Sequence, residues 1–274
     1  MLTHEQLTDF SRRGWIIQEG VFDDDFMDAC RVAMDERTDT QPADRKEIDP
    51  DINFGLINHQ QVFRDCFLHP MMIEGCRQLM GTELRHRFTW MNIKEPHLER
   101  HTNRQALMDI DRLAWHRDMR PKWGTFVDDD DPSLANCILI NCMVPVTDIG
   151  PDDGGTMVLE GSHKLEGAGI SELRQCPVAQ IEAPRGSVVY FPETLMHTAV
   201  PILSEKKRYV MFYAFVPPWF EVWHGGEVPK EIVESYDDLT LRRIIGGGIT
   251  GNRREGLGGD EVRLAFRRRG IRFR

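Results

Sequence analysis

The sequence predicts a mainly β protein, with a sandwich or barrel core and helices flanking it. Short apolar, β-branched segments recur between about residues 84 and 217, separated by glycine- and proline-rich turns. Before residue 81, apolar side chains instead recur at helical spacing between residues that favour helix ends. With 274 residues and 41% hydrophobic content, the chain is long enough for one good core, and a single domain is expected.

Three helices are predicted before residue 81, and they are expected to be packing elements. Each begins at a capping residue or a proline, and two of them end at a glycine. The predicted first and last residues are, in chain order, Thr3 and Gly14, Asp23 and Arg37, and Pro70 and Gly81. The polar stretch 38–61 between the second and third helices is either a surface loop or a flap over a site.

The strands are expected in the middle of the chain, apart from a short one directly after the first helix. Their predicted ranges are 15–17, 84–94, 136–146, 178–183, 187–191 and 208–216. A helix is predicted from Pro229 to Ile245, ended by Gly246. An arginine-rich tail, 252–274, follows, and a solvated or oligomer-contacting tail is a better interpretation than a site for an anionic partner.

Composition excludes several classes of function. A net charge of -10 disfavours a nucleic-acid-binding surface. Six cysteines without a Cys-x-x-Cys pair indicate reduced, mostly buried thiols. No signal peptide or apolar stretch of membrane-spanning length is visible, so we expect a cytoplasmic protein without a membrane partner. The run Asp128–Asp131 is interpreted as a solvated loop, because a calcium loop needs alternating acids and a turn glycine.

Four residues suggest a metal centre with an anion anchor. His116 and Asp118 lie two apart, so in an extended segment both side chains point to the same face. His197 follows the predicted strand 187–191 and a turn. Two histidines and one carboxylate form the facial triad that binds non-haem Fe(II) and leaves positions open. Arg208 opens a long apolar strand, and its planar fork suits a carboxylate.

With these residues the chain resembles the phytanoyl-CoA dioxygenase family of Fe(II)/2-oxoglutarate-dependent oxygenases. The stretch 148–164, which closes with Gly161-Ser162-His163-Lys164, reinforces the resemblance. The resemblance implies a double-stranded β-helix (jelly roll, cupin-like) core. The expected organisation is one oxygenase domain, 1–274, with N-terminal helices at about 3–81, the core at about 84–217 and a C-terminal helix and basic tail at 218–274.

The resemblance also implies a reaction. Fe(II) would be held by His116, Asp118 and His197, and Arg208 would hold the distal carboxylate of 2-oxoglutarate. The expected enzyme is a dioxygenase that consumes O₂, releases succinate and CO₂, and oxidises an unactivated C–H bond of a small molecule, most often to an alcohol. Ascorbate is expected to help. Related halogenases replace the carboxylate with a small residue, so Asp118 disfavours halogenation; desaturation, epoxidation and rearrangement stay open.

Further residues are assigned to the expected pockets. Asn92 and Lys94 share a face of the strand that lines the cosubstrate pocket in the resembled family, although a solvated strand face is the alternative. Family members often carry a hydroxyl residue two after the distal histidine; here that position is Ala199, so Thr198 beside it is the candidate. An apolar substrate pocket, or ordinary core, is expected at Trp90, Trp115, Met119, Phe191 and Trp219.

Two other functions compete with an oxygenase. A zinc hydrolase could use the same three ligands, but it leaves Arg208 unexplained, and no general-base glutamate stands beside a ligand as in His-Glu-x-x-His. A non-catalytic jelly-roll binding protein would be expected to have lost a ligand or the arginine, and all four residues are present. The substrate is expected to be a small molecule such as a secondary metabolite; the sequence leaves its identity and the oligomeric state open.

Overall fold

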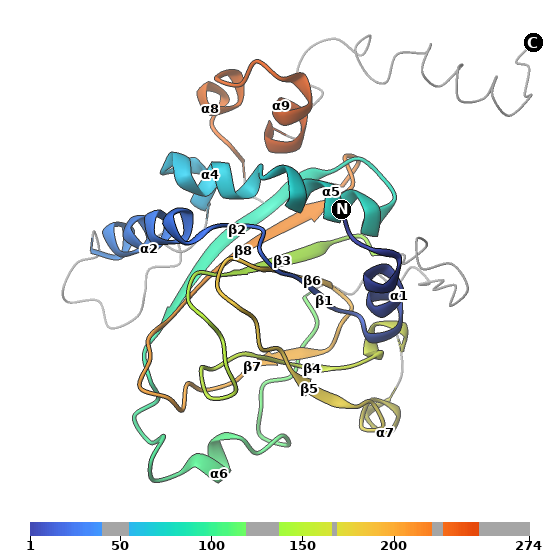
Figure 1. Ribbon diagram of the computed structural model, residues 1–274. Coiled ribbons are helices and arrows are strands. Elements are labelled where there is room, and N and C mark those ends of the chain that lie inside the picture. Colours follow the sequence, from blue (N-terminus) through green and yellow to red (C-terminus); the bar gives the residue numbers. More distant parts are fainter. Residues whose placement is uncertain (40–54, 119–136, 166–168, 221–226, 247–274) are drawn as a thin grey trace, which may run out of the picture.

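Two facing antiparallel sheets form the centre of the protein, and helices cover the outer face of the larger sheet (Figure 1). The structure is a computed structural model that describes residues 1–39, 55–118, 137–165, 169–220 and 227–246. This architecture is the predicted jelly roll, mainly β with flanking helices. The proposed single-domain organisation of the whole chain stays a prediction.

The strand order places the longest strands next to each other. The larger sheet has the order β1-β6-β3-β8-β2 and the smaller has the order β5-β4-β7. Their bounds are β1 Ile16–Gln18, β2 Arg85–Lys94, β3 Ile140–Pro145, β4 Thr156–Leu159, β5 Val178–Gln180, β6 Val188–Pro192, β7 His197–Ala199 and β8 Arg208–Val216. Strand β8 pairs along its whole length with β2, from Lys94 opposite Arg208 to Arg85 opposite Val216. Each predicted strand range overlaps one of these elements, whereas the short strands β4 and β7 lie outside the predicted ranges.

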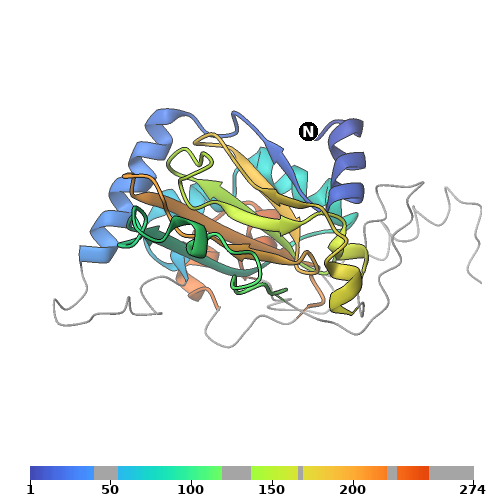
Figure 2. The same cartoon turned by 90° about the horizontal axis from the view of Figure 1, so that it is seen from below.

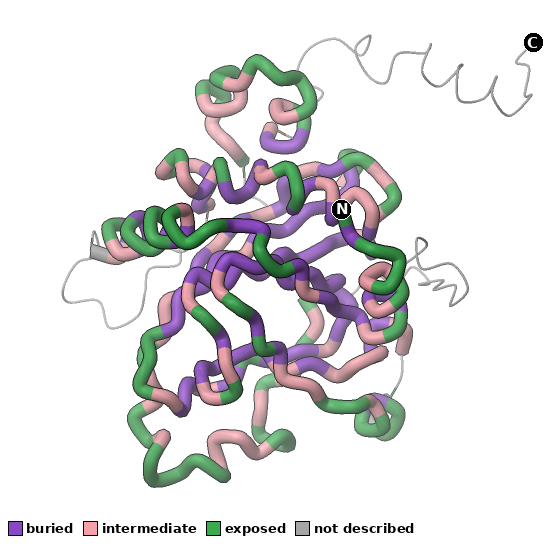
Figure 3. Tube along the Cα trace, in the orientation of Figure 1, coloured by how far each residue is buried: buried purple, intermediate pink, exposed green. Residues whose placement is uncertain are grey.

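Strand β8 has two faces with different neighbours. Successive side chains of a strand point to opposite faces. Met211 and Tyr213 belong to the cluster that packs under the helices, whereas Val210 and the half-buried Phe212 belong to the cluster between the two sheets. Arg208, two residues before Val210, therefore also faces the space between the sheets. Buried positions follow the strands, and exposed ones follow the turns and outer helix faces (Figure 3).

The N-terminal helices begin and end where the sequence predicts. Thr3 forms a capping box at the start of α1 (His4–Arg13), and Gly14 ends it in the left-handed conformation. The Asp23 carboxylate accepts the Phe26 N–H at 2.8 Å at the start of α2 (Asp24–Asp39). Gly81 ends α5 (Pro70–Met80) in the same way as Gly14 ends α1. Helices α1 and α2 lie at opposite ends of the larger sheet (Figure 2).

Several short elements lie in stretches that the sequence leaves irregular. They are η1 Leu56–Asn58, α4 Gln61–Phe67, α6 Arg104–Leu107, η3 Ser162–Lys164 and α7 Ile170–Leu173. Part of the predicted loop or flap, residues 40–54, lies outside the described residues, as do the Asp128–Asp131 run and the tail 252–274.

The predicted C-terminal helix is wrong in one respect, because it is two helices. Helix α8 covers Lys230–Glu234 and α9 covers Leu239–Gly246. The Asp238 carboxylate accepts the N–H groups of Thr240 and Leu241, at 2.6 and 3.3 Å, and so caps α9. Aspartate competes with helix continuation in this way, and the cap starts a new helix instead of extending the first.

All six cysteines are free thiols, as predicted, and five of them are buried. Burial raises the pKa of the Cys66 thiol well above its usual range, so this thiol stays protonated. In the described part of the chain, no helix is both long and apolar enough to cross a membrane.

Candidate metal centre

The two segments that carry the triad lie side by side. His197 is the first residue of β7, after the turn that follows β6. His116 pairs with it in an isolated antiparallel bridge, in which each residue's N–H donates to the other's carbonyl at 2.9 Å. Apart from this bridge, the segment around His116 is irregular, because Trp115 N–H donates to the Leu113 carbonyl at 2.9 Å. The expected extended segment is thus reduced to one bridge.

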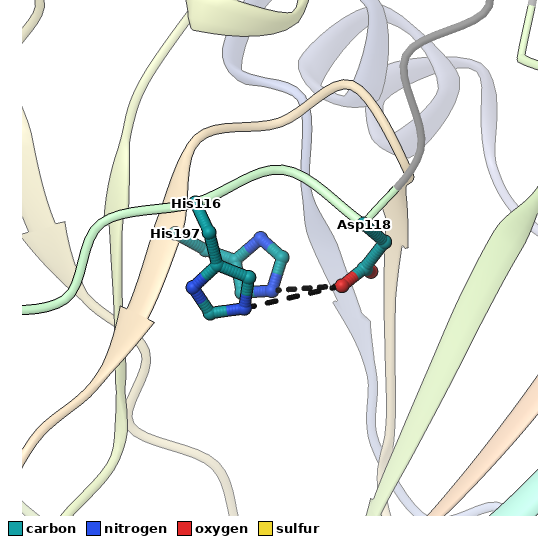
Figure 4. A group of neighbouring side chains, drawn as sticks. All are labelled: His116, Asp118 and His197. Carbon is teal, nitrogen blue, oxygen red and sulfur yellow. Dashed lines mark ion pairs between the residues drawn. The ribbon is translucent and has the colours of Figure 1, made fainter.

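The side chains of His116, Asp118 and His197 converge (Figure 4). Their ligand atoms all lie within 4.8 Å of one another. Asp118 Oδ1 is 3.6 Å from His197 Nε2 and 4.0 Å from His116 Nε2. The imidazole of His197 is 10% exposed and that of His116 is 53% exposed. One of the three side chains is therefore buried, while another is exposed to solvent.

Backbone carbonyls select the tautomer of both histidines. His116 Nδ1 lies 2.9 Å from the Ala114 carbonyl, and His197 Nδ1 lies 2.9 Å from the Leu195 carbonyl. A carbonyl only accepts, so each Nδ1 carries the proton, and the lone pair of each Nε2 points into the triad. Burial lowers the pKa of His197, against the opposing effect of Asp118, and favours the neutral imidazole that binds metals.

Asn141 orients the carboxylate of the triad. Its amide nitrogen donates to Asp118 Oδ2 at 2.6 Å, while Oδ1 faces the two histidines. Asn141 is 3% exposed and stands in the otherwise apolar strand β3. The main chain helps, because Asp118 N–H donates to the Glu193 carbonyl at 3.1 Å. One carboxylate oxygen is thereby occupied, and the other is presented to a metal.

Glu193 ties the turn before His197 to the start of β3. Its carboxylate oxygens accept the N–H groups of Ile138 and Leu139, each at 3.0 Å. Burial raises the pKa of Glu193 to about 7, although the two N–H donors act in the opposite direction. Glu193 is 1% exposed, so its carboxylate is enclosed by the protein and fixes the turn before His197 to the start of β3.

Arg208, which is buried, forms a basic pair with the half-buried Lys94 on β8 and β2. Its guanidinium donates to Asn92 Oδ1 at 2.8 Å, and Lys94 stands directly opposite in the strand register. Burial lowers the pKa of Arg208 to about 10; burial and then the charge of Arg208 lower that of Lys94. A buried cation beside a half-buried one is costly without an anion, so this end of the site suits an acidic ligand.

The residues fit a metal and a dicarboxylate on two observations of chemistry. Two neutral imidazoles and one oriented carboxylate suit Fe(II), which accepts mixed nitrogen and oxygen ligands. The buried Nε of Arg208 finds no hydrogen-bond partner among the described residues, although buried donors are normally paired. A ligand carboxylate would complete this guanidinium.

Thr198 lies on the opposite face of β7 from His197. His197 pairs with Val158, which belongs to the cluster between the sheets. The next residue, Thr198, points to the opposite face, and its hydroxyl donates only to the Ala199 carbonyl at 3.4 Å. Ala199 shares the face of His197 and supplies no hydroxyl. A cosubstrate contact from Thr198 stays a prediction.

The five residues expected to line a substrate pocket separate into groups. Trp90 stacks on Phe212 across β2 and β8, with ring centroids 4.3 Å apart, on the face shared with Arg208. Phe191 is buried and turns toward the ring of His197, with the ring centroids 5.2 Å apart.

The other three expected pocket residues have different surroundings. The indole N–H of Trp115 donates to the Ile110 carbonyl at 2.9 Å. Trp219 is 62% exposed, and Met119 lies outside the described residues.

Sequence reasoning missed the residues that hold the ligands in place. Asn141 and Glu193 are such residues, and Arg117, between the first two ligands, is a third. A usable signal existed for Asn141, which is a single amide in the apolar run 138–146. Nothing in the local pattern marks the other two residues, because their partners are backbone groups from distant segments.

The sequence matches the family described as phytanoyl-CoA dioxygenase (PhyH) over residues 10–210. It is also 27% identical over 150 residues to the dioxygenase olcK of Penicillium canescens, a match that covers 52% of this chain. The match covers 47% of that relative, so the chain spans about half the length of the curated relative that it resembles.

Solved structures with the same fold include two bacterial proteins. HygX from Streptomyces hygroscopicus, with nickel and 2-oxoglutarate bound, has a TM-score of 0.61 and 21% identity, covering 82% of this chain and 90% of its own. EctD from S. alaskensis, in its apoform, has a TM-score of 0.60 and 17% identity, covering 84% of this chain and 80% of its own. These likenesses confirm the predicted jelly roll.

Proposed function

The chain belongs to the phytanoyl-CoA dioxygenase family, and from that premise we propose that it is an Fe(II)- and 2-oxoglutarate-dependent dioxygenase. The observation that carries the proposal is the convergence of the His116, Asp118 and His197 ligand atoms within 4.8 Å of one another. Iron with bound 2-oxoglutarate and O₂ would supply the oxidising chemistry, releasing succinate and CO₂.

The residues of this chain would divide the work. His116, Asp118 and His197 would hold the metal through Nε2 and Oδ1 atoms, and Asn141 would keep the carboxylate turned toward it. Arg208 would bind the distal carboxylate of 2-oxoglutarate. Asn92 holds the guanidinium in place at 2.8 Å, and Lys94 adds positive charge opposite it. The apolar cluster between the sheets would exclude water from one side of the site.

The substrate is proposed to be a small organic molecule, with hydroxylation of an unactivated C–H bond as the reaction. Support comes from the solvent exposure of the His116 side chain, which is 53%, and from the half-buried Trp90–Phe212 pair. HygX has been solved with nickel, 2-oxoglutarate and hygromycin B bound, and SnoN is a non-haem α-ketoglutarate-dependent epimerase from nogalamycin biosynthesis. A secondary metabolite is therefore the first class to screen.

An anaerobic titration tests the proposal directly. Metal-free protein receives Fe(II) and then 2-oxoglutarate, and the visible charge-transfer band of the metal–ligand chelate is recorded. The wild-type protein should develop the band, and His116→Ala and Arg208→Ala should weaken or abolish it. Succinate release with candidate substrates then reports turnover.

The same titration separates the alternatives. A zinc hydrolase or a binding protein with a retained fold would take up metal without 2-oxoglutarate and would give no band. That result, with wild-type protein that is folded and loaded with Fe(II), would overturn the assignment of Arg208 and the oxygenase with it.

A further inference from the structure

Arg117 stands between two of the proposed metal ligands and reaches two other segments of the chain. Its Nε donates to the Thr194 carbonyl at 2.7 Å, in the turn before His197. Its Nη2 donates to the carbonyls of Ser162 and Leu165, at 2.9 and 3.2 Å. One guanidinium thus ties the His116–Asp118 segment to the turn that leads into the third ligand.

Ser162 completes this connection from the other side. Its hydroxyl oxygen accepts the Met196 N–H at 2.9 Å, next to His197, while its carbonyl accepts from Arg117. Ser162 is fully buried. The residue therefore bonds to both segments that carry metal ligands.

The segment that carries Ser162 is itself fixed to the N-terminal helix. His163 Nε2 lies 2.9 Å from the Ser11 carbonyl, and Gly161 N–H donates to the Arg13 carbonyl at 2.9 Å. Gly161 has φ +79°, a conformation that favours glycine. This gives the Gly-Ser-His-Lys motif a physical role, since the motif joins the end of α1 to the metal centre.

The backbone around His116 shows why the bonds made by Arg117 and Ser162 are needed. Within the described residues, the backbone of the His116–Asp118 segment bonds to the backbone of segment 193–197 through the His116–His197 bridge and through Asp118 N–H, which donates to the Glu193 carbonyl. Metal sites require ligands held within about half an ångström of their working positions. Hydrogen bonds that orient ligands typically change metal affinity or activity by about ten- to a hundred-fold.

We infer that Arg117 and Ser162 are positioning residues that set the distance between the His116–Asp118 pair and His197. The inference rests on the proposed function, because it assumes that these three residues bind Fe(II). Loss of either residue should weaken metal binding while leaving the anchor at Arg208 intact.

The test compares Fe(II) dissociation constants, measured anaerobically at saturating 2-oxoglutarate, for four variants. Arg117→Ala should raise the constant about ten- to a hundred-fold; Arg117→Lys and Ser162→Ala should raise it less. Arg112→Ala is the matched control on the same segment, because Arg112 is exposed and its ion pair among the described residues is a local one, with Asp109 at 3.3 Å. The KM for 2-oxoglutarate at saturating Fe(II) should stay unchanged in all four.

Each outcome decides something different. A dissociation constant for Arg117→Ala equal to that of the wild type would overturn the positioning role and leave the oxygenase proposal untouched. An equal rise in Arg112→Ala, or a parallel rise in the KM for 2-oxoglutarate, would indicate general destabilisation and would also overturn it. If Arg117→Ala does not fold, Arg117→Lys and Ser162→Ala decide by the same criteria. Wild-type protein without an Fe(II)- and 2-oxoglutarate-dependent band would remove the proposed function itself.

Discussion

The two ends of the site are built in different ways. The end that contains Arg208 lies in regular strands, with β8 paired along its whole length to β2, and Arg208 is 5% exposed. The end that contains His116 and Asp118 lies outside the strands and is more exposed; the His116 side chain is 53% exposed. The sheet's own hydrogen-bond ladder positions Arg208, whereas the metal end depends on bonds between side chains and distant backbone groups.

This difference has a functional consequence. A ladder of backbone bonds resists the loss of any one side chain, so the Arg208 end should tolerate changes around it. The metal end has few backbone bonds, so each side-chain bond there carries more of the geometry. Exposure also has a use, because a metal that activates O₂ beside a substrate needs an open position.

The largest expected effect is at Asp118. Asp118→Ala removes one of three proposed ligands together with the bond from Asn141, so Fe(II)-dependent turnover should fall by more than about a hundred-fold. Succinate release and the chelate band measure it. Asp109→Ala, an exposed acid on the same segment, should behave as the wild type. Turnover near the wild-type rate in Asp118→Ala would refute the proposed ligand set.

A smaller, selective effect is expected at Arg208. Hydrogen bonds between charged partners contribute about 1.5–3 kcal/mol, so Arg208→Ala should raise the KM for 2-oxoglutarate by about ten- to a hundred-fold. The Fe(II) affinity measured without 2-oxoglutarate should be unchanged. Arg208 bonds to Asn92, and among the described residues no hydrogen bond or ion pair joins it to the triad. Arg208→Lys keeps the charge and should recover part of the loss. If Arg208→Ala lowers the affinity for Fe(II) as much as the affinity for 2-oxoglutarate, Arg208 and the triad do not act independently.

A minor effect is expected at Thr198. Thr198→Val preserves the shape of the side chain and removes a hydroxyl that donates only to the Ala199 carbonyl. The KM for 2-oxoglutarate should change less than about two-fold, since one weak neutral hydrogen bond contributes little net free energy. Steady-state kinetics with varied 2-oxoglutarate measure it. A rise as large as that in Arg208→Ala would place the hydroxyl in the cosubstrate site after all.

The smallest effect on turnover is expected at His86, which lies in β2 on the face under the helices. Its ring packs edge-on against Phe67, and neither ring nitrogen has a hydrogen-bond partner among the described residues. Burial lowers the pKa of His86 from 6.5 to about 3. The folded state therefore keeps a neutral imidazole, while the unfolded chain takes up a proton below about pH 6.5.

This difference in the pKa of His86 between the folded and unfolded states makes the protein less stable as the pH falls. The stability that comes from His86 is complete above about pH 6.5 and is lost as the pH falls toward about 3. At about pH 5 the loss amounts to about 2 kcal/mol, at about 1.4 kcal/mol per pKa unit. His86→Leu should remove this part of the acid sensitivity and leave neutral-pH turnover unchanged; urea unfolding at about pH 7.5 and pH 5 measures it. An unchanged acid dependence in the variant would contradict the assignment.

Much of the fold could be predicted because its signals are local. The capping box at Thr3, the glycines that end helices at Gly14 and Gly81, and the apolar strand that Arg208 opens are all read from neighbouring residues. The C-terminal helix was predicted less well, since the Asp238 cap that divides it competes with a helical pattern on both sides. Short helices such as α4 carried no strong start signal; its N-cap residue, Gln60, makes no capping hydrogen bond.

The site divides along the same line. The sequence by itself determined which side chains could bind metal and anion, because the chemistry of His116, Asp118, His197 and Arg208 belongs to the residues themselves. Only the tertiary structure decided which groups bond to those side chains, and on which face of β7 Thr198 lies. Asn141, Glu193 and Arg117 act on partners at least 23 residues away in sequence, at distances such as 2.6 Å between Asn141 and Asp118. Such contacts depend on how distant segments meet in space, which no local pattern of residues specifies.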